Sequence, residues 1–234
     1  MIDFHSHILP NIDDGSRDVN ESLELLRLSA NQGIDTLVAT PHFYVERDTV
    51  ESFLIKRQKA YDTLIEHIKE EDLPHVECGA EVYFFNELSQ LDNVESLAIG
   101  SSRYILIEMP FEIWTKRTYD SLYNLRVKKR LIPIIAHIER YFPVQRDMKK
   151  INALLDMDVL VQMNGSYINN WQTRRKALSL LKRDKVHILG SDCHNTENRK
   201  PNLKSAYDII EKKLGINKIM EIDTVGKKIL ESTS

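Results

Sequence analysis

The sequence predicts an α/β protein whose parallel strands close into a distorted barrel of seven β/α units. Short apolar, β-branched segments alternate with longer amphipathic ones throughout the 234 residues, which is typical of a parallel sheet. The repeat averages about 33 residues, the spacing of a (β/α) barrel. No phosphate-binding glycine fingerprint follows the first strand, which disfavours the alternative, a doubly wound open sheet.

Seven segments have the composition of buried strands. Each is a short run rich in Val, Ile and Leu and too short to be a complete helix. The expected strands are residues 2–5, 36–40, 76–83, 104–108, 132–137, 159–163 and 187–190.

The segments between the strands carry apolar residues at helical spacing. Asp18 followed by Glu21 is a capping box, and Leu23 and Leu26 recur on one face behind it. The first helix is therefore expected to run to about Gln32. Later helices are expected at residues 50–68, 118–129, 147–157, 173–184, 202–214 and 217–230.

The composition is that of a globular protein with no general affinity for anions. Hydrophobic residues make up 42% and charged residues 29%, and 32 Lys and Arg against 35 Asp and Glu leave a net charge of −3. This balance argues against a nucleic-acid or membrane-surface partner, so any anion site has to be local. Residues 84–102 are less regular than the rest, but no linker rich in Pro, Gly or Ser divides the chain, and we expect one domain over residues 1–234.

Cysteine usage and the first residues indicate a cytoplasmic protein. Two cysteines cannot form a disulfide framework, and Met1-Ile2-Asp3-Phe4-His5 lacks the basic and apolar regions of a signal peptide. No segment reaches the ~20 consecutive apolar residues of a membrane-spanning helix, so we expect no membrane insertion.

Residue types that bind metals collect where the predicted strands end. Six of the seven strands carry one there, and the carboxyl ends of barrel strands converge on one mouth. The pair His5 and His7 is the strongest signal, because alternation in a strand projects both imidazoles to one face. The candidate ligands are His5, His7, Asp14, His42, Glu81, Glu108, His137, Asp192 and His194.

The number of candidates predicts more than one ion. A lone histidine or carboxylate near a strand end is usually a satisfied polar residue, but clustered carboxylates cannot all ionise cheaply without a cation. One zinc ion needs only three or four ligands, so two or three ions with a bridging carboxylate are expected. Imidazole and carboxylate ligands without thiolates would suit manganese, iron or zinc. Such ion clusters clamp the attacking and leaving oxygens in phosphate ester hydrolysis.

Seven short motifs contain these candidate ligands. They are Asp3-Phe4-His5-Ser6-His7, Asp13-Asp14-Gly15, Thr40-Pro41-His42, Gly79-Ala80-Glu81, Ile107-Glu108, Ala136-His137-Ile138-Glu139-Arg140 and Gly190-Ser191-Asp192-Cys193-His194. Together they resemble the motifs of the polymerase and histidinol phosphatase (PHP) superfamily. Within it the chain is most similar to the bacterial manganese-dependent protein tyrosine phosphatases of the CpsB/CapC type, found in capsule and exopolysaccharide operons. The resemblance covers residues 1 to about 200, with every ligand position present.

The resemblance implies a (β/α)7 barrel of the PHP type with a trinuclear manganese site. It also implies dephosphorylation of the tyrosine-rich tail of a cognate bacterial tyrosine kinase, by direct attack of a metal-bound hydroxide on phosphorus. Arg140 and Arg199 match the phosphate-contacting arginines, a role that suits the forked guanidinium. The implied ligand sets are His5, His7, Glu81 and Asp192 on one ion; Glu81, Glu108 and His137 on the second; and Asp14, His42 and His194 on the third.

A second phosphatase motif is present and is rejected. Cys193 and Arg199 have the Cys-x5-Arg spacing of thiolate-dependent tyrosine phosphatases. That chemistry needs a cradle of backbone N–H groups, favoured by glycines, and a thiol of low pKa. The intervening residues include Glu197 and no glycine. Cys78 is interpreted as a small buried apolar residue.

Other residues have two interpretations each. Five aromatic residues that follow strand ends either form a rim for a phosphotyrosine ring or pack in the core: Tyr44, Phe111, Trp114, Tyr167 and Trp171. Three histidines are expected to be structural or exposed: His67, His75 and His187.

Three other functions are open to the same chain. A histidinol-phosphate phosphatase would use the same metals and differ only in substrate. A non-catalytic module on a degenerate barrel would have lost ligands, and none is lost. A nuclease is disfavoured by the acidic balance.

Overall fold

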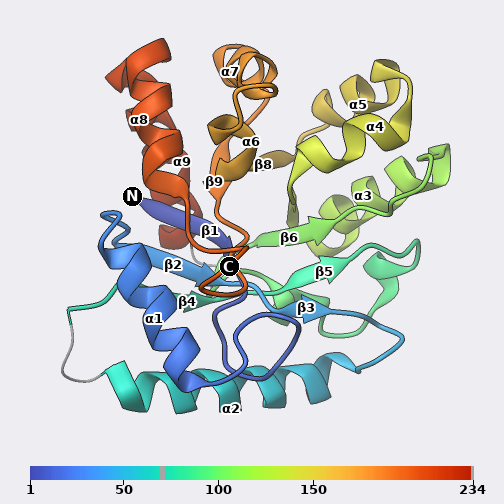
Figure 1. The fold of residues 1–234 in the computed structure, drawn as a ribbon. Coiled ribbons are helices and arrows are strands. Elements are labelled where there is room, and N and C mark those ends of the chain that lie inside the picture. The colour runs from blue at the N-terminus through green and yellow to red at the C-terminus, as the bar shows by residue number, and fades with distance from the viewer. Residues whose placement is uncertain (69–71, 233–234) are drawn as a thin grey trace.

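Parallel strands lie at the centre of the molecule and helices surround them (Figure 1). The structure is a computed structural model that describes residues 1–68 and 72–232. The strands described are β1 (Ile2–Ser6), β2 (Thr36–Ala39), β3 (His42–Phe43), β4 (His75–Cys78), β5 (Glu81–Tyr83), β6 (Tyr104–Glu108), β7 (Ile132–Ile135), β8 (Leu160–Asn164) and β9 (Ile188–Gly190). They form two sheets of order β1-β2-β4 and β3-β5-β6-β7-β8-β9, and all pairs are parallel.

One expected strand is divided in two, and its neighbour is continued by a second short strand. Residues 76–83 form β4 and β5, so the prediction of one uninterrupted strand there is wrong. Similarly, β3 follows β2 after a break at Pro41, which has no N–H to donate to a ladder. The Pro41 carbonyl accepts a hydrogen bond from the Glu81 N–H at 3.0 Å. Both breaks carry the chain from the first sheet into the second.

The two sheets also meet through β1 and β9. The N–H of Asp192 donates to the His5 carbonyl at 2.7 Å, and the N–H of His7 donates to the Cys193 carbonyl at 2.8 Å. Ser6 and Cys193 form a parallel bridge. The parallel sheet is therefore curled, and the segments that follow β1 and β9 lie side by side at the carboxyl ends of the strands.

All the expected helices are present. The α-helices described are α1 (Val19–Ala30), α2 (Val50–Ile68), α3 (Lys116–Lys129), α4 (Phe142–Gln145), α5 (Met148–Leu155), α6 (Gly165–Asn169), α7 (Arg174–Lys182), α8 (Leu203–Leu214) and α9 (Ile216–Glu231). The short helices α4 and α6 were not predicted. The less regular segment 84–102 contains the 3-10 turns η1 (Leu88–Gln90) and η2 (Val94–Leu97), and η3 (Ile138–Tyr141) follows β7.

Helix α1 begins with half of the expected capping box. The Asp18 carboxylate accepts a hydrogen bond from the Glu21 N–H at 3.0 Å, which satisfies a free donor at the helix start. The Glu21 carboxylate accepts instead from the backbone N–H and the Nε of Arg17, both at 2.9 Å. These bonds anchor the end of the β1–α1 loop.

Apolar side chains fill the space between the strands and the helices. A large cluster includes Leu37 and Phe53, and a smaller one gathers Phe4, Ile134 and Ile229. Within the part of the chain that the structure describes, no helix is long and apolar enough to cross a membrane.

Candidate metal centre

The structure brings the nine candidate ligands together at the carboxyl ends of the strands. By position they are His5 in β1, His7 after it, Asp14 in the β1–α1 loop, His42 in β3, Glu81 in β5, Glu108 at the end of β6, His137 after β7, and Asp192 and His194 after β9. Seven are buried, whereas His42 is half-buried and Asp14 is exposed. Parallel strands deliver these side chains to one place because their carboxyl ends share one side of the sheet.

Glu81 lies at the centre of four imidazoles. Its Oε2 atom is 3.2 Å from His5 Nε2, 3.3 Å from His7 Nε2 and 3.1 Å from His42 Nδ1. Its Oε1 atom is 2.8 Å from His137 Nε2. Burial would raise the pKa of Glu81, but the charge of His5 and the hydrogen bonds from the surrounding histidines hold that pKa well below its ordinary value.

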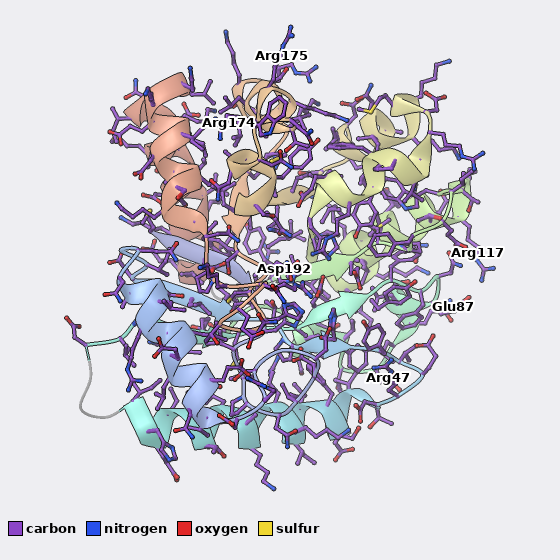
Figure 2. All side chains as sticks on the ribbon, in the orientation of Figure 1. Arg47, Glu87, Arg117, Arg174, Arg175 and Asp192 are labelled. Carbon is purple, nitrogen blue, oxygen red and sulfur yellow. The ribbon has the colours of Figure 1, made fainter. Side chains whose placement is uncertain are left out.

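Asp192 connects the histidines to both candidate arginines. Its Oδ1 atom lies 3.6 Å from the Nε2 atoms of His5 and His7. Arg199 donates to the same oxygen at 2.7 Å, and Arg140 pairs with Oδ2. Figure 2 shows Asp192 near the middle of the molecule. The two arginine side chains are 36% and 39% exposed, so an incoming anion can reach them.

Two candidate ligands sit on strained backbone. The φ angle is 29° at His137 and 55° at Asp192, where an L-residue costs on the order of 1–3 kcal/mol. Strain of this kind concentrates at functional sites, because the surrounding structure has to maintain it.

The buried carboxylates of the cluster favour positive charge on the neighbouring histidines. Burial lowers the pKa of His7, but hydrogen bonds to Asp13 and Glu81 outweigh it and raise that pKa to about 10. For His137, burial is likewise outweighed by Glu108 and Glu81, which raise its pKa to about 9. Divalent cations would supply the same positive charge in place of these protons.

The donor atoms form three groups that could each hold an ion, with all ligand atoms of a group within 4.8 Å of one another. The groups are His7, Asp14, His42 and His194; His5, His7 and Glu81; and His42, Glu81 and Glu108. They overlap the ligand sets implied by the resemblance but differ from them, because none contains His137 or Asp192. His194 Nε2 is buried and has no hydrogen-bond partner among residues 1–68 and 72–232. Nitrogen and oxygen donors of this kind fit manganese, iron or zinc.

Asp13 supports the cluster, although the sequence singled out only its neighbour Asp14. Its Oδ2 atom lies 2.7 Å from His7 Nδ1 and accepts the His42 N–H at 3.0 Å, and its Oδ1 atom accepts the Gly15 N–H at 2.9 Å. The signal in the sequence was the doubled aspartate before a glycine.

Two polar residues of β8 were also missed. Gln162 Oε1 lies 3.3 Å from His5 Nδ1 and accepts the His137 N–H at 2.6 Å. Asn164 Nδ2 donates to Asp192 Oδ2 at 3.0 Å. Alternate polar residues in an otherwise apolar strand were the available signal.

The described residues do not form a thiolate phosphatase site around Cys193. Cys193 is fully buried, and burial raises the pKa of its thiol far above the ordinary value. Arg199 is directed at Asp192 instead. Cys78 is half-buried, and burial raises its pKa to about 11.

Aromatic side chains border the cluster on one side. The Tyr44 ring centroid lies 5.3 Å from that of His42, and Phe111 lies 6.4 Å from His137. Tyr83, which was not among the candidates, lies 5.5 Å from Tyr44.

The remaining candidates lie elsewhere. Trp114 is fully buried, so the core-packing interpretation holds for it. Tyr167 lies 6.2 Å from the Phe142 ring, and Trp171 is 77% exposed. Also outside the cluster are His67 and His75, which are exposed, and His187, which accepts a hydrogen bond from the Val161 N–H.

Two proteins with similar sequences are named tyrosine-protein phosphatases. The tyrosine-protein phosphatase CpsB of Streptococcus pneumoniae is 34% identical over 237 residues, covering 95% of this chain and 94% of that protein. The tyrosine-protein phosphatase YwqE of Bacillus subtilis is 33% identical, covering 92% of this chain and 85% of that protein.

Solved structures agree on the fold. One crystal structure comes from a study of YwqE from Bacillus subtilis and CpsB from Streptococcus pneumoniae, described there as unique metal-dependent tyrosine phosphatases. It superposes on this chain with a TM-score of 0.87 at 29% sequence identity, and the match covers 100% of this chain and 96% of the other. The family model for capsular polysaccharide synthesis proteins CpsB/CapC matches residues 1–230. The chain therefore belongs to the CpsB/CapC family.

Proposed function

We propose that this chain is a metal-dependent protein-tyrosine phosphatase, which hydrolyses phosphotyrosine in a protein substrate. The observation that carries the proposal is the convergence of nine imidazole and carboxylate side chains beside two half-exposed arginines. The named relatives are tyrosine-protein phosphatases, and they match this chain over nearly its whole length.

The proposed ions are manganese, two or three per chain. Glu81 suits a bridging role because its two oxygens face different histidines. The proposed ligand sets are His5, His7, Glu81 and Asp192; Glu81, Glu108 and His137; and Asp14, His42 and His194. Iron or zinc would also suit these donors.

The chain's own part in the reaction is to bind and orient the phosphate. When bound, the ions supply positive charge and activate water for attack on phosphorus. Arg140 and Arg199 both contact Asp192 and present forked donors that match phosphate oxygens. Both can stabilise the negative charge that develops in the transition state. Asp192 keeps the two guanidinium groups in place before the substrate arrives.

The proposed fold is a closed barrel of seven strands. Counting β2 with β3 and β4 with β5 as single units gives seven strands in a distorted (β/α)7 barrel of the PHP type. The hydrogen bonds between the segments after β1 and β9 support closure of this barrel. We take residues 1–234 to be one domain.

The proposed substrate is the phosphorylated tail of a bacterial tyrosine kinase in the cytoplasm. The family's description, capsular polysaccharide synthesis, supports the biological setting. Both cysteines are free thiols, which fits a reducing compartment.

Substrate comparison tests the proposal. The manganese-loaded protein should hydrolyse a phosphotyrosine peptide with a kcat/KM at least about 100-fold above that for histidinol phosphate, because the two differ by several contacts beyond the phosphate. The reverse order would replace the proposal with a histidinol-phosphate phosphatase.

A further inference from the structure

A hollow of about 280 Å³ adjoins the metal centre. Its lining includes Asp13, Asp14 and His42 together with Tyr44, Arg47 and Asp48. Part of the lining therefore belongs to the proposed catalytic cluster, whereas Tyr44, Arg47 and Asp48 have no part in the proposed reaction.

Arg47 presents an unpaired cation to this hollow. The side chain is exposed, and its Cζ atom lies 4.5 Å from the centroid of the Tyr44 ring. Within the residues that the structure describes, no carboxylate lies within 4.0 Å of its guanidinium. The neighbouring acid, Asp48, is occupied by Lys56 at 2.6 Å and by Ser52 at 2.9 Å.

The stacking partner of this cation is itself packed against other rings. The centroid of the Tyr44 ring lies 5.3 Å from that of His42 and 5.5 Å from that of Tyr83. The Arg47 guanidinium is therefore no more than about 10 Å from the His42 imidazole. Figure 2 shows Arg47 outside the central region marked by Asp192, and Arg117 with its partner Glu87 at the edge of the molecule.

We propose that Arg47, held on Tyr44, binds an anionic group of the substrate chain beside the phosphotyrosine. The proposal rests on the proposed function, because it assumes a phosphotyrosine at the metal centre. An extended chain spans about 3.3–3.6 Å per residue, so the distance suits a residue about one to three positions from the phosphotyrosine. A carboxylate and a second phosphate both match the guanidinium fork.

Such a subsite makes the enzyme selective for acidic sequences around the phosphotyrosine. The site is open to solvent, so the contribution of a single ion pair is moderate and is screened by salt. We expect a preference of about three- to tenfold for an acidic over a neutral neighbour.

The test compares four phosphotyrosine peptides that differ only in the two residues on each side. These residues are Gln, Glu, Lys or, for a second phosphate, phosphotyrosine. The readout is the ratio of kcat/KM for each peptide to that for the Gln peptide, on manganese-loaded protein. The unaltered protein should prefer the Glu and phosphotyrosine peptides, and their relative values show which anion Arg47 favours.

Charge reversal gives the sharpest outcome. Arg47→Glu should invert the order, so that the Lys peptide becomes the best substrate, and Arg47→Gln should bring the ratios close to one. The matched control is Arg117→Glu, an exposed arginine on α3 that pairs with Glu87, and it should keep the original order.

If Arg47→Glu leaves the ratios of kcat/KM unchanged, the proposed subsite is wrong. An equal loss on all four peptides would also contradict the subsite and would indicate a structural role. Failure of the unaltered protein to hydrolyse any of the peptides would overturn the proposed function as well, so the two failures are distinguishable.

Discussion

The Nδ1 atom of His7 lies 2.7 Å from the Oδ2 atom of Asp13, and this pair orients an imidazole within the cluster of candidate metal ligands. Burial would raise the pKa of Asp13, but the hydrogen bonds from His7, Gly15 and His42 hold it below its ordinary value. The carboxylate therefore stays ionised and keeps His7 Nε2 directed at Glu81, 3.3 Å away.

Asp13→Asn should weaken manganese binding by about 10- to 100-fold, the effect typical of losing a carboxylate behind a metal-bound histidine. Calorimetric titration of the metal-free protein with manganese measures this affinity. Asp156→Asn, which removes an exposed carboxylate paired with Lys185, is the control and should bind normally. Equal affinities for the two variants would show that Asp13 does not support the site.

Arg140→Ala should lower kcat by about 100- to 1,000-fold while the protein still binds its ions, because a donor to the developing charge is lost. Arg126→Ala is a matched control, since Arg126 is 38% exposed and is also paired with an aspartate, Asp158. Steady-state kinetics and metal content are measured on the same samples. Loss of metal together with activity would instead assign Arg140 a structural role.

Cys193→Ser should keep kcat/KM within about threefold, because a buried thiol of raised pKa is not a nucleophile. Thermal unfolding shows whether any decline in activity comes from lower stability or from the loss of a catalytic group. An inactive but fully folded variant that still binds manganese would restore the thiol mechanism.

Gly190→Ala should damage both stability and metal binding. An added Cβ would lie 2.5 Å from His5 Cβ and 2.7 Å from Gln162 Nε2, so β9 and β1 have to separate. The cost is about 1–3 kcal/mol in the free energy of unfolding, measured by urea denaturation.

Gly215→Ala provides the comparison for that variant. Gly215 has a φ of 88° and open space around it, so alanine there is strained by a similar amount, about 1–3 kcal/mol. It lies between α8 and α9, away from the cluster. Manganese affinity should therefore fall only in Gly190→Ala, and an equal fall in both would mean that the affinity merely follows stability.

Most of the helices and strands could be predicted from the sequence, because the spacing of apolar residues that marks each element lies within the element itself. All the expected helices formed, and the strand ends predicted where the ligand types would meet. The division of residues 76–83 into β4 and β5 was not predictable from periodicity, because it depends on which neighbouring strand each half finds.

The clustering of the candidate ligands was predictable because these residues recur at strand ends, whereas the residues that contact them from β8 were harder to predict. Gln162 and Asn164 act through partners more than 20 residues away in the sequence, which spacing cannot reveal. Arg47 was missed for a different reason: Tyr44 is close to it in the sequence, but the stacking of the two side chains is visible only in the structure.

The most direct test of the central claim is phosphate release from a phosphotyrosine peptide by protein stripped of metal with a chelator and then titrated with manganese. Metal content is measured on the same samples. The stripped protein should be inactive, and activity should return in proportion to bound manganese and level off at two or three ions per chain. An undiminished rate from protein that holds no measurable metal would contradict the claim.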